Sequence, residues 1–186
     1  MDWVERARQG DGQAFRRLVE QQARPLFRIC VRITRDEALA EDAVQEALYK
    51  AWRGLPAFDG RAAFSTWLHQ IAVNAALEQL RRNARHRHEL SEGDQADDET
   101  GDFLAAQGDD GPSPEDLARG DELTRRVDVQ LARMSALERA AFVMRHYEGE
   151  SLETIAEALS LNIGQSKQAI FRAVRKLRGA LQAWRV

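Results

Sequence analysis

Residues 151–178, SLETIAEALSLNIGQSKQAIFRAVRKLR, constrain the fold more than any other stretch of this chain. Ser151 is placed to cap a first helix, and Asn162 is placed to cap a second helix after a turn over 160–162. Apolar residues recur at helical spacing in both halves, and the second half also carries basic and amide side chains. A short helix, a tight turn and a basic second helix predict a helix-turn-helix, whose second helix enters the DNA major groove. The alternative is a helical hairpin with a solvated basic face.

The sequence before residue 89 also follows helical periodicity. Four candidate helices occupy residues 3–9, 11–33, 36–54 and 65–88. The three longer candidates each start at a capping residue, Asp11, Asp36 and Ser65. Pro25 is expected to bend or split the helix that contains it. No stretch has the pattern of a strand, so the predicted fold class is all-α.

Helical patterns resume after residue 112. Ser113-Pro114 marks a helix start, with a helix expected to about residue 134. Ser135 and Glu138 form a capping box for the helix before the helix-turn-helix, and Gly149 is expected to end that helix. In the second helix of the helix-turn-helix, the predicted apolar stripe consists of Ile163, Ile170, Val174, Leu177 and Leu181.

Charge divides the chain into three segments. Residues 1–88 carry 15 Lys and Arg against 11 Asp and Glu, and residues 123–186 carry 11 against 6. Residues 89–122 between them carry 1 against 13. The overall net charge of −3 therefore hides two basic blocks of the kind that bind nucleic acid. The acidic strip has few aliphatic residues, which predicts two helical domains, 1–88 and 113–186, joined by a flexible acidic linker at 89–112.

Several function classes find no support in the sequence. There is no Gly-rich phosphate loop, and the four histidines lack metal-ligand spacing. Cys30, the only cysteine, is expected to be a core thiol. The N-terminus lacks a signal peptide pattern, and no apolar run is long enough to span a membrane. We therefore expect a cytoplasmic protein that is not an enzyme and uses no cofactor.

Ordered motifs in both halves resemble those of a bacterial extracytoplasmic-function (ECF) sigma factor of the sigma-70 family. AEDAVQEALYKAW and FDGRAAFSTWLHQIAVNAA resemble successive motifs of sigma region 2. LERAAFVMRHYEGESLETIAEAL and IGQSKQAIFRAVRKLR resemble the two parts of region 4. The resemblance covers nearly the whole chain outside the linker. It implies a factor that binds core RNA polymerase, recognises promoter DNA and helps to open it, with an anti-sigma factor as a further expected partner.

The resemblance assigns roles to three groups of residues. The polymerase-docking group is Glu41, Asp42, Gln45 and Glu46. The group that meets the −10 element as an unpaired strand is Phe58, Gly60, Arg61, Asn74, Arg81 and Arg82. The group that meets the −35 element as duplex is Lys167, Gln168, Phe171, Arg172 and Arg175. A loop aromatic, an amide and arginines suit base stacking, base-edge hydrogen bonds and phosphate contacts. Trp67 could also stack on a base, but its spacing favours the core.

The chain departs from the family pattern around the turn. Ser160 stands where Gly is usual, and must accept a left-handed backbone conformation. Gln165-Ser166 stand where Thr-Val is usual, and Ala169 stands where Arg is usual. These changes bear on the preference for the −35 sequence.

Two other functions fit parts of the sequence. A stand-alone helix-turn-helix regulator would use the C-terminal half, but would not need the acidic helix or the FDGRAAFSTWL segment. A decoy would bind an anti-sigma protein without initiating transcription.

Overall fold

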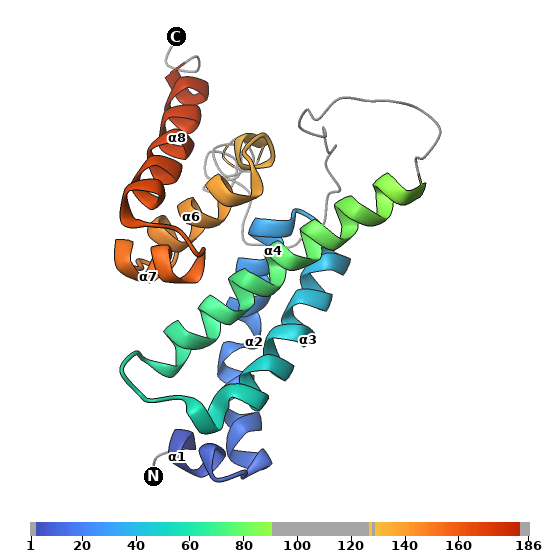
Figure 1. Cartoon of the computed structure of the whole chain (residues 1–186), viewed down its shortest axis with the longest axis vertical. Helices are drawn as coiled ribbons and strands as arrows, with labels where there is room; N and C mark the ends of the chain where they lie inside the picture. The colour runs from blue at the N-terminus through green and yellow to red at the C-terminus, as the bar shows by residue number, and fades with distance from the viewer. Residues whose placement is uncertain (1–2, 91–126, 128, 183–186) are drawn as a thin grey trace, which may run out of the picture.

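The computed structural model describes residues 3–90, 127 and 129–182, and every regular element within these ranges is helical (Figure 1). This confirms the all-α prediction. The elements are α1 (Trp3–Arg8), α2 (Gly12–Thr34), α3 (Glu37–Gly54), the 3₁₀ turn η1 (Leu55–Ala57), α4 (Phe64–Leu90), α6 (Ala136–His146), α7 (Leu152–Ala158) and α8 (Ile163–Gln182). None of the helices in this described part of the chain is long and apolar enough to cross a membrane. Residues 89 and 90, predicted to begin the linker, belong to α4, whereas the rest of the predicted linker and the predicted helix start at Ser113 lie outside the described residues.

Side-chain caps fix most of the helix starts that the sequence predicts. The Asp11 carboxylate accepts hydrogen bonds from the backbone N–H groups of Gln13 and Ala14, at 2.9 and 3.1 Å. Asp36 accepts one from Leu39 at 2.9 Å. These bonds satisfy N–H groups that have no partner within the helix. The prediction for Ser65 is wrong, because α4 begins one residue earlier, at Phe64.

Pro25 does not split α2, which runs unbroken from Gly12 to Thr34. Proline removes the hydrogen bond to the carbonyl four residues earlier, here that of Gln21. Gln21 is an exposed residue, so water can replace the missing donor. Leu26 and Ile29, just beyond the proline, are fully buried and hold the helix against the core. The prediction of a split helix is therefore wrong.

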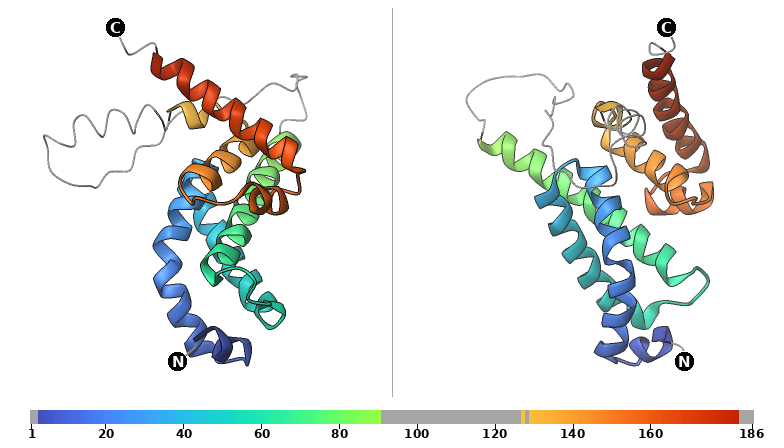
Figure 2. Two further views of the ribbon diagram at one scale, coloured as in Figure 1. Left: turned by 90° about the vertical axis from the view of Figure 1, so that its left-hand side faces the viewer. Right: turned by 180° about the vertical axis from the view of Figure 1, so that it is seen from behind.

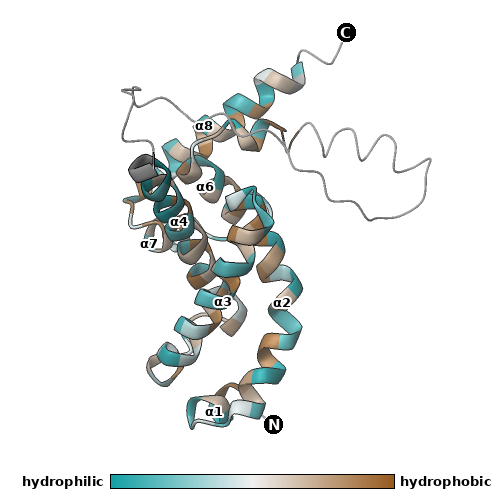
Figure 3. Ribbon diagram, turned by 90° about the vertical axis from the view of Figure 1, so that its right-hand side faces the viewer, coloured by the Kyte–Doolittle hydropathy of each residue, from teal (hydrophilic) through white to brown (hydrophobic). Residues whose placement is uncertain are grey.

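Helices α2, α3 and α4 lie side by side and share the main core (Figure 1). The core face of α3 consists almost wholly of alanines, and Ala40, Ala43, Ala47 and Ala51 are completely buried. Small side chains let this helix approach its neighbours closely. Larger apolar residues come from α2 and α4, and Figure 3 shows how apolar and polar positions alternate along α2.

Helices α6, α7 and α8 form a second group that packs against the first (Figure 2). The guanidinium of Arg32 on α2 lies 4.0 Å from the ring centroid of Tyr147, just after α6. His69 Nδ1 on α4 lies 3.2 Å from Glu148 Oε2, and both side chains are largely buried. Buried residues of both groups belong to one continuous apolar cluster. The two groups are therefore in direct contact in this structure.

Candidate functional site

The helix-turn-helix is built by α7 and α8, with the predicted caps in place. Ser151 Oγ accepts a hydrogen bond from the Thr154 N–H at 3.0 Å, and Ser160 occupies the turn with φ at 54°. At the start of α8, Asn162 Oδ1 accepts from the Gln165 N–H at 2.8 Å. Gln165 Oε1 in turn accepts from the Asn162 N–H at 2.9 Å. Gln165, one of the departures from the family pattern, thus completes a reciprocal capping box.

The other two departures in α8 face the protein interior. Ser166 is fully buried, and its hydroxyl donates a hydrogen bond to the Asn162 carbonyl at 3.1 Å. The one polar atom of this buried side chain therefore has a partner. Ala169 is 7% exposed and packs in the core. The side chain at position 169 therefore points into the core, away from the exposed face of α8. Ile163, which the sequence predicts to face inward, is 43% exposed, so that prediction is wrong.

The outward face of α8 carries the side chains expected to meet duplex DNA. All five are exposed: Lys167, Gln168, Phe171, Arg172 and Arg175. Phe171 is 64% exposed, so its ring lies on the surface between these polar side chains.

One turn beyond Arg172, an ion pair joins α8 to α6. Lys176 Nζ lies 2.6 Å from Glu138 Oε2. Desolvation opposes the charge on Glu138, but the hydrogen bonds from Lys176 and the Ser135 N–H outweigh it and lower the pKa of this carboxyl. The same glutamate completes the predicted capping box with Ser135.

The loop between η1 and α4 has a buried base and an exposed tip. Phe58 is only 7% exposed, and its ring centroid lies 4.9 Å from that of Trp67. At the tip, Asp59 accepts a hydrogen bond from the Arg61 N–H at 3.0 Å, and Gly60 has φ at 72°. The Arg61 side chain is 90% exposed. Phe58 therefore fixes the shape of the loop from within, and Arg61 is the side chain that can reach a ligand.

Helix α4 continues from this loop and carries the other residues expected at the −10 element. Asn74 is exposed although residues on both sides of it are buried. Further along, Glu78 pairs with three arginines, at 3.6 Å to Arg81, 3.2 Å to Arg82 and 3.6 Å to Arg85. The side chains of Arg81 and Arg85 remain about two-thirds exposed, at 65% and 69%. They stay accessible to phosphate groups.

On the acidic face of α3, three residues are exposed and the fourth forms ion pairs within the protein. Glu41, Asp42 and Gln45 are exposed. The Glu46 side chain is 17% exposed and pairs with Lys50 at 2.6 Å and with Arg82 at 3.2 Å. The hydrogen bond from Lys50 is the main cause that lowers the pKa of Glu46. Glu46 and Arg82, assigned by sequence to two different interfaces, therefore bind each other and tie α3 to α4.

Sequence reasoning missed one prominent residue on α3. Tyr49 is 61% exposed and lies one turn beyond Gln45, on the same face of the helix. Its hydroxyl accepts a hydrogen bond from Arg53 Nη1 at 3.2 Å. The signal was present in the sequence, because Glu41, Gln45 and Tyr49 are spaced four residues apart.

Comparison with known protein families finds two matches, in the same order along the chain. A family described as sigma-70 region 2 matches residues 18–86, and one described as sigma-70 region 4 matches residues 124–177. The RNA polymerase sigma-H factor of Pseudomonas aeruginosa is 36% identical over 180 residues, which cover 96% of this chain and 92% of that protein. The ECF RNA polymerase sigma-E factor of Haemophilus influenzae is 33% identical, with coverage of 96% and 93%.

Two solved structures share the fold. The sigma factor RpoE from Bartonella quintana, solved in complex with the anti-sigma factor NepR, superposes with a TM-score of 0.66 at 23% identity, over 90% of this chain and 96% of that one. CnrH, solved in complex with the cytosolic domain of CnrY, superposes with a TM-score of 0.63 at 23% identity, over 97% and 96%.

Proposed function

This chain belongs to the ECF family of sigma-70 factors, and we propose that it binds core RNA polymerase through α3 and directs transcription from specific promoters through α4 and α8. The observation that carries this proposal is the presence, on one chain, of an exposed acidic helix face and two separate exposed faces suited to DNA. A stand-alone regulator would need only one of them, the exposed face of α8. In this role the protein is a non-enzymatic partner, and the polymerase performs the chemistry in the cytoplasm.

Polymerase docking is assigned to the exposed part of α3. Glu41, Asp42 and Gln45 point away from the core, and the carboxylates of Glu41 and Asp42 suit a basic partner surface. Tyr49 extends the same face with an exposed aromatic ring. Tyrosine is enriched at interfaces because it buries a large area at low entropic cost. Glu46 contributes indirectly, because its ion pair with Arg82 holds α3 against α4.

Recognition of the −10 element is assigned to the η1–α4 loop and to α4. We place an unpaired base against the loop tip at Gly60 and Arg61, with Asn74 available for base-edge hydrogen bonds. Phe58 acts indirectly, since its ring is packed against Trp67 and cannot stack on a base without leaving the core. Arg81 and Arg85 are the available phosphate ligands further along the helix.

Recognition of the −35 element is assigned to the outward face of α8. Lys167, Gln168 and Arg172 have the donors and acceptors that read base edges in the major groove, and Arg175 suits a phosphate. Phe171, between them, can contact a thymine methyl group. The family-atypical residues at positions 165, 166 and 169 serve the cap and the core, so the base-reading set here comes from the other exposed positions.

Regulation by an anti-sigma factor is part of the proposal. The solved RpoE structure contains the anti-sigma factor NepR, and we extend that partnership to this chain on the strength of the shared fold. We also retain the domain division at 1–88, 89–112 and 113–186. Its two outer parts contain all of the residues matched by the region 2 and region 4 families.

Reconstitution with core polymerase tests the proposed function. The chain should support run-off transcripts from a subset of a promoter library, while core polymerase alone should give none from that subset. A variant with Glu41→Lys and Asp42→Lys should lose these transcripts. Sequence-specific duplex binding by the isolated chain, with no transcripts in the presence of core polymerase, would support the stand-alone regulator instead.

A further inference from the structure

The contact between the two groups of helices contains titratable side chains that none of the three surfaces above uses. His69 on α4 lies with Nδ1 3.2 Å from Glu148 Oε2, and with Nε2 3.3 Å from Gln22 Oε1 on α2. Only 14% of the His69 side chain and 15% of the Glu148 side chain are exposed. Glu150 accepts a hydrogen bond from Thr66 on α4 and interacts electrostatically with both His69 and Glu148. One imidazole from the first group and two carboxylates from the second therefore meet at this contact.

The arginines near these carboxylates bind other partners. Arg145 Nη1 donates a hydrogen bond to the backbone carbonyl of Glu150 at 2.7 Å. The guanidinium of Arg32 on α2 lies over the ring of Tyr147, 4.0 Å from its centroid. In the described part of the chain, the side chain that pairs with the Glu148 carboxylate is His69.

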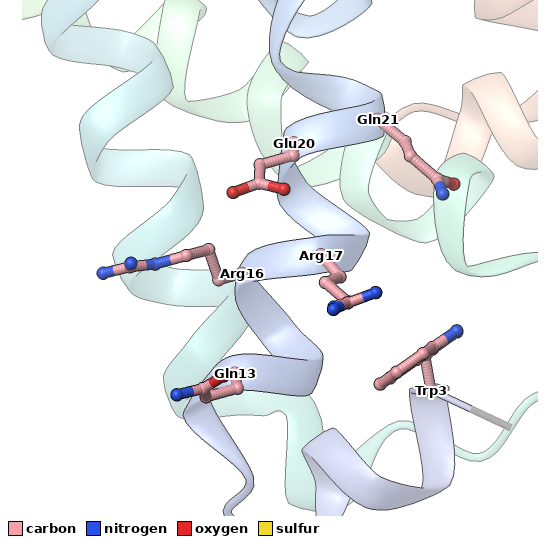
Figure 4. A pocket seen from close by; sticks show the side chains of 6 residues that line it. All are labelled: Trp3, Gln13, Arg16, Arg17, Glu20 and Gln21. Atoms are coloured by element: carbon pink, nitrogen blue, oxygen red, sulfur yellow. The ribbon is translucent and has the colours of Figure 1, made fainter. Parts of the chain in front are cut away.

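Helix α2 separates the contact from the pocket beside α1. Gln21 lines that pocket together with Trp3 and Arg17 (Figure 4). Gln22 follows about 100° further around the helix axis, at 3.6 residues per turn, and contacts His69 instead. Changes at His69 are therefore expected to leave the pocket as it is.

The charge at this contact depends on the protonation of His69. A histidine side chain changes its charge between about pH 5 and pH 8. While His69 is neutral, Glu148 and Glu150 place two negative charges at a contact from which most of the solvent is excluded. Proton uptake by His69 adds an ion pair with Glu148 across the contact, in surroundings where charges interact more strongly than in water. The contact should therefore become stronger as pH falls.

Glu150 changes the contact in the same direction. Burial raises the pKa of its carboxyl above the ordinary value of 4.5, and Glu148 adds to this effect, whereas His69 and Thr66 oppose it. A carboxyl with a raised pKa is tolerated in the folded structure while it is protonated, and it becomes unfavourable as pH rises through the raised value. Acid thus strengthens the contact at His69 and at Glu150 alike.

The contact also limits the distance between the two DNA-reading faces. Asn74 lies five residues beyond His69 on α4, about 8 Å at 1.5 Å per residue. The chain from Glu148 to Lys167 passes through α7 and spans at most about 45 Å, even with its non-helical residues fully extended. The −10 and −35 elements are about 25 base pairs apart, or about 85 Å of straight duplex at 3.4 Å per base pair. A chain that keeps this contact cannot reach both elements, so the contact has to open in the promoter complex.

We propose that His69, Glu148 and Glu150 form a pH-sensitive latch, which holds the two groups of helices together more tightly as pH falls from about 8 to about 6. At the higher pH the latch opens more readily, and the two DNA-reading faces are free to separate. The effect on transcription rests on the proposed function, whereas the latch itself is a property of the isolated chain.

The test measures the latch by single-molecule energy transfer in the isolated full-length chain. Dyes are attached at Ala23→Cys on α2 and at Glu157→Cys on α7, two exposed positions that lie on opposite sides of the contact. Cys30 is buried and its pKa is raised to about 12, so the dyes react with the introduced cysteines. The ratio of contacted to separated chains should increase about fivefold from pH 8 to pH 6. The ring protons of His69 should titrate by NMR with the same midpoint in the wild-type chain, a measurement that needs no variant.

Three variants and one control assign the response to the latch. His69→Gln keeps a side chain that can form hydrogen bonds but cannot take up a proton, so the response should fall below twofold. Glu148→Gln removes the partner charge and should have the same effect. Glu150→Gln removes a partly buried charge and should favour contacted chains already at pH 8. The control His146→Gln also removes a histidine, whose ring lies 4.6 Å from that of Phe142 on the same helix, and it should keep the wild-type response.

Each contrary result has a distinct meaning. A full response in His69→Gln would overturn the latch, because other groups would then cause the pH dependence. An equal loss of response in His146→Gln would overturn the assignment to His69. Constant energy transfer between pH 6 and pH 8, while His69 titrates by NMR, would show that its proton does not affect the contact.

Transcription by reconstituted holoenzyme tests the consequence separately. The ratio of wild-type to His69→Gln transcripts should rise from pH 6 to pH 8, because only the wild-type latch is tightened by acid. A constant ratio would exclude the latch from the control of initiation. A normal energy-transfer response without transcripts at either pH would overturn the proposed function and leave the latch standing.

Discussion

Charge reversal on α3 should separate the residues proposed to dock the polymerase from a residue that holds the fold together. Glu41 and Asp42 are exposed and do not contact the core of the protein. Replacing both with lysine should therefore change the free energy of unfolding by less than about 0.5 kcal/mol. Glu46 lies on the same helix but is engaged with Lys50 and Arg82. Its replacement should act mainly on stability.

The size of the docking effect follows from the exposure of the two carboxylates. An exposed ion pair typically contributes about 0.5 kcal/mol, and a reversed charge replaces that attraction with repulsion of similar size, so each reversal costs about 1 kcal/mol. Two reversals should cost about 2 kcal/mol, or about 30-fold in the dissociation constant for core polymerase. The loss should shrink as salt is raised, because the charges are screened.

The stability effect of Glu46→Gln follows from its contacts. Besides the two ion pairs, Glu46 Oε2 accepts a hydrogen bond from Gln79 Nε2 at 3.0 Å. Lys50 and Arg82 are about half exposed, at 47% and 52%, which weakens both ion pairs. We expect a loss of about 1–2 kcal/mol, equivalent to a fall of about 2–8 °C in Tm for a chain of this length.

Thermal unfolding and a binding titration with core polymerase measure the two effects on the same variants. We expect the variant with Glu41→Lys and Asp42→Lys to bind core polymerase more weakly and to keep the wild-type Tm. We expect Glu46→Gln to have a lower Tm, and to keep wild-type affinity for core polymerase at temperatures where the variant is folded. Unchanged affinity in the double reversal would refute the docking surface. An unchanged Tm for Glu46→Gln would refute the structural role of its ion pairs.

Three further predictions concern single residues. Gln165→Ala should remove half of the capping box at Asn162 and lower stability by about 0.5–1 kcal/mol in urea unfolding, whereas Gln165→Glu should keep the bond. The lowered pKa of Glu138 gives a stabilising contribution that is present above its ordinary value of 4.5 and is lost as pH falls through the folded value, so Glu138→Gln should make stability less dependent on pH below about 4.5. Burial raises the pKa of Cys30 to about 12, so Ellman's reagent should react with it far more slowly in the native protein than in denaturant.

The sequence predicts those parts of the fold that depend on local chemistry. The caps at Asp11, Asp36, Ser135 and Ser151 are confirmed, because a capping side chain binds backbone groups only two or three residues away. The left-handed turn at Ser160 follows from the tight connection between two helices and is also confirmed.

Features that depend on tertiary contacts could not be predicted from local sequence patterns. The pairing of Glu46 with Arg82 joins residues from different helices, and no local pattern indicates it. The burial of Phe58 likewise depends on Trp67 and on the α1–α2 cluster. Pro25 suggested a bend or a split in this helix, and the split does not occur, because local rules count the missing hydrogen bond but not the core residues that hold α2 together.

The central claim is that two separate surfaces read promoter DNA at different stages, and permanganate footprinting of holoenzyme on its promoter tests it most directly. Asn74→Ala should leave duplex binding nearly intact and abolish much of the thymine reactivity near the start site, because Asn74 acts on the unpaired strand. Lys167→Ala with Arg172→Ala should reduce formation of the closed complex, and a pre-melted template should not rescue it fully, since each lost base-reading contact costs about 1–3 kcal/mol. Normal opening with Asn74→Ala, together with a defect confined to melting in the Lys167 and Arg172 variant, would contradict the account.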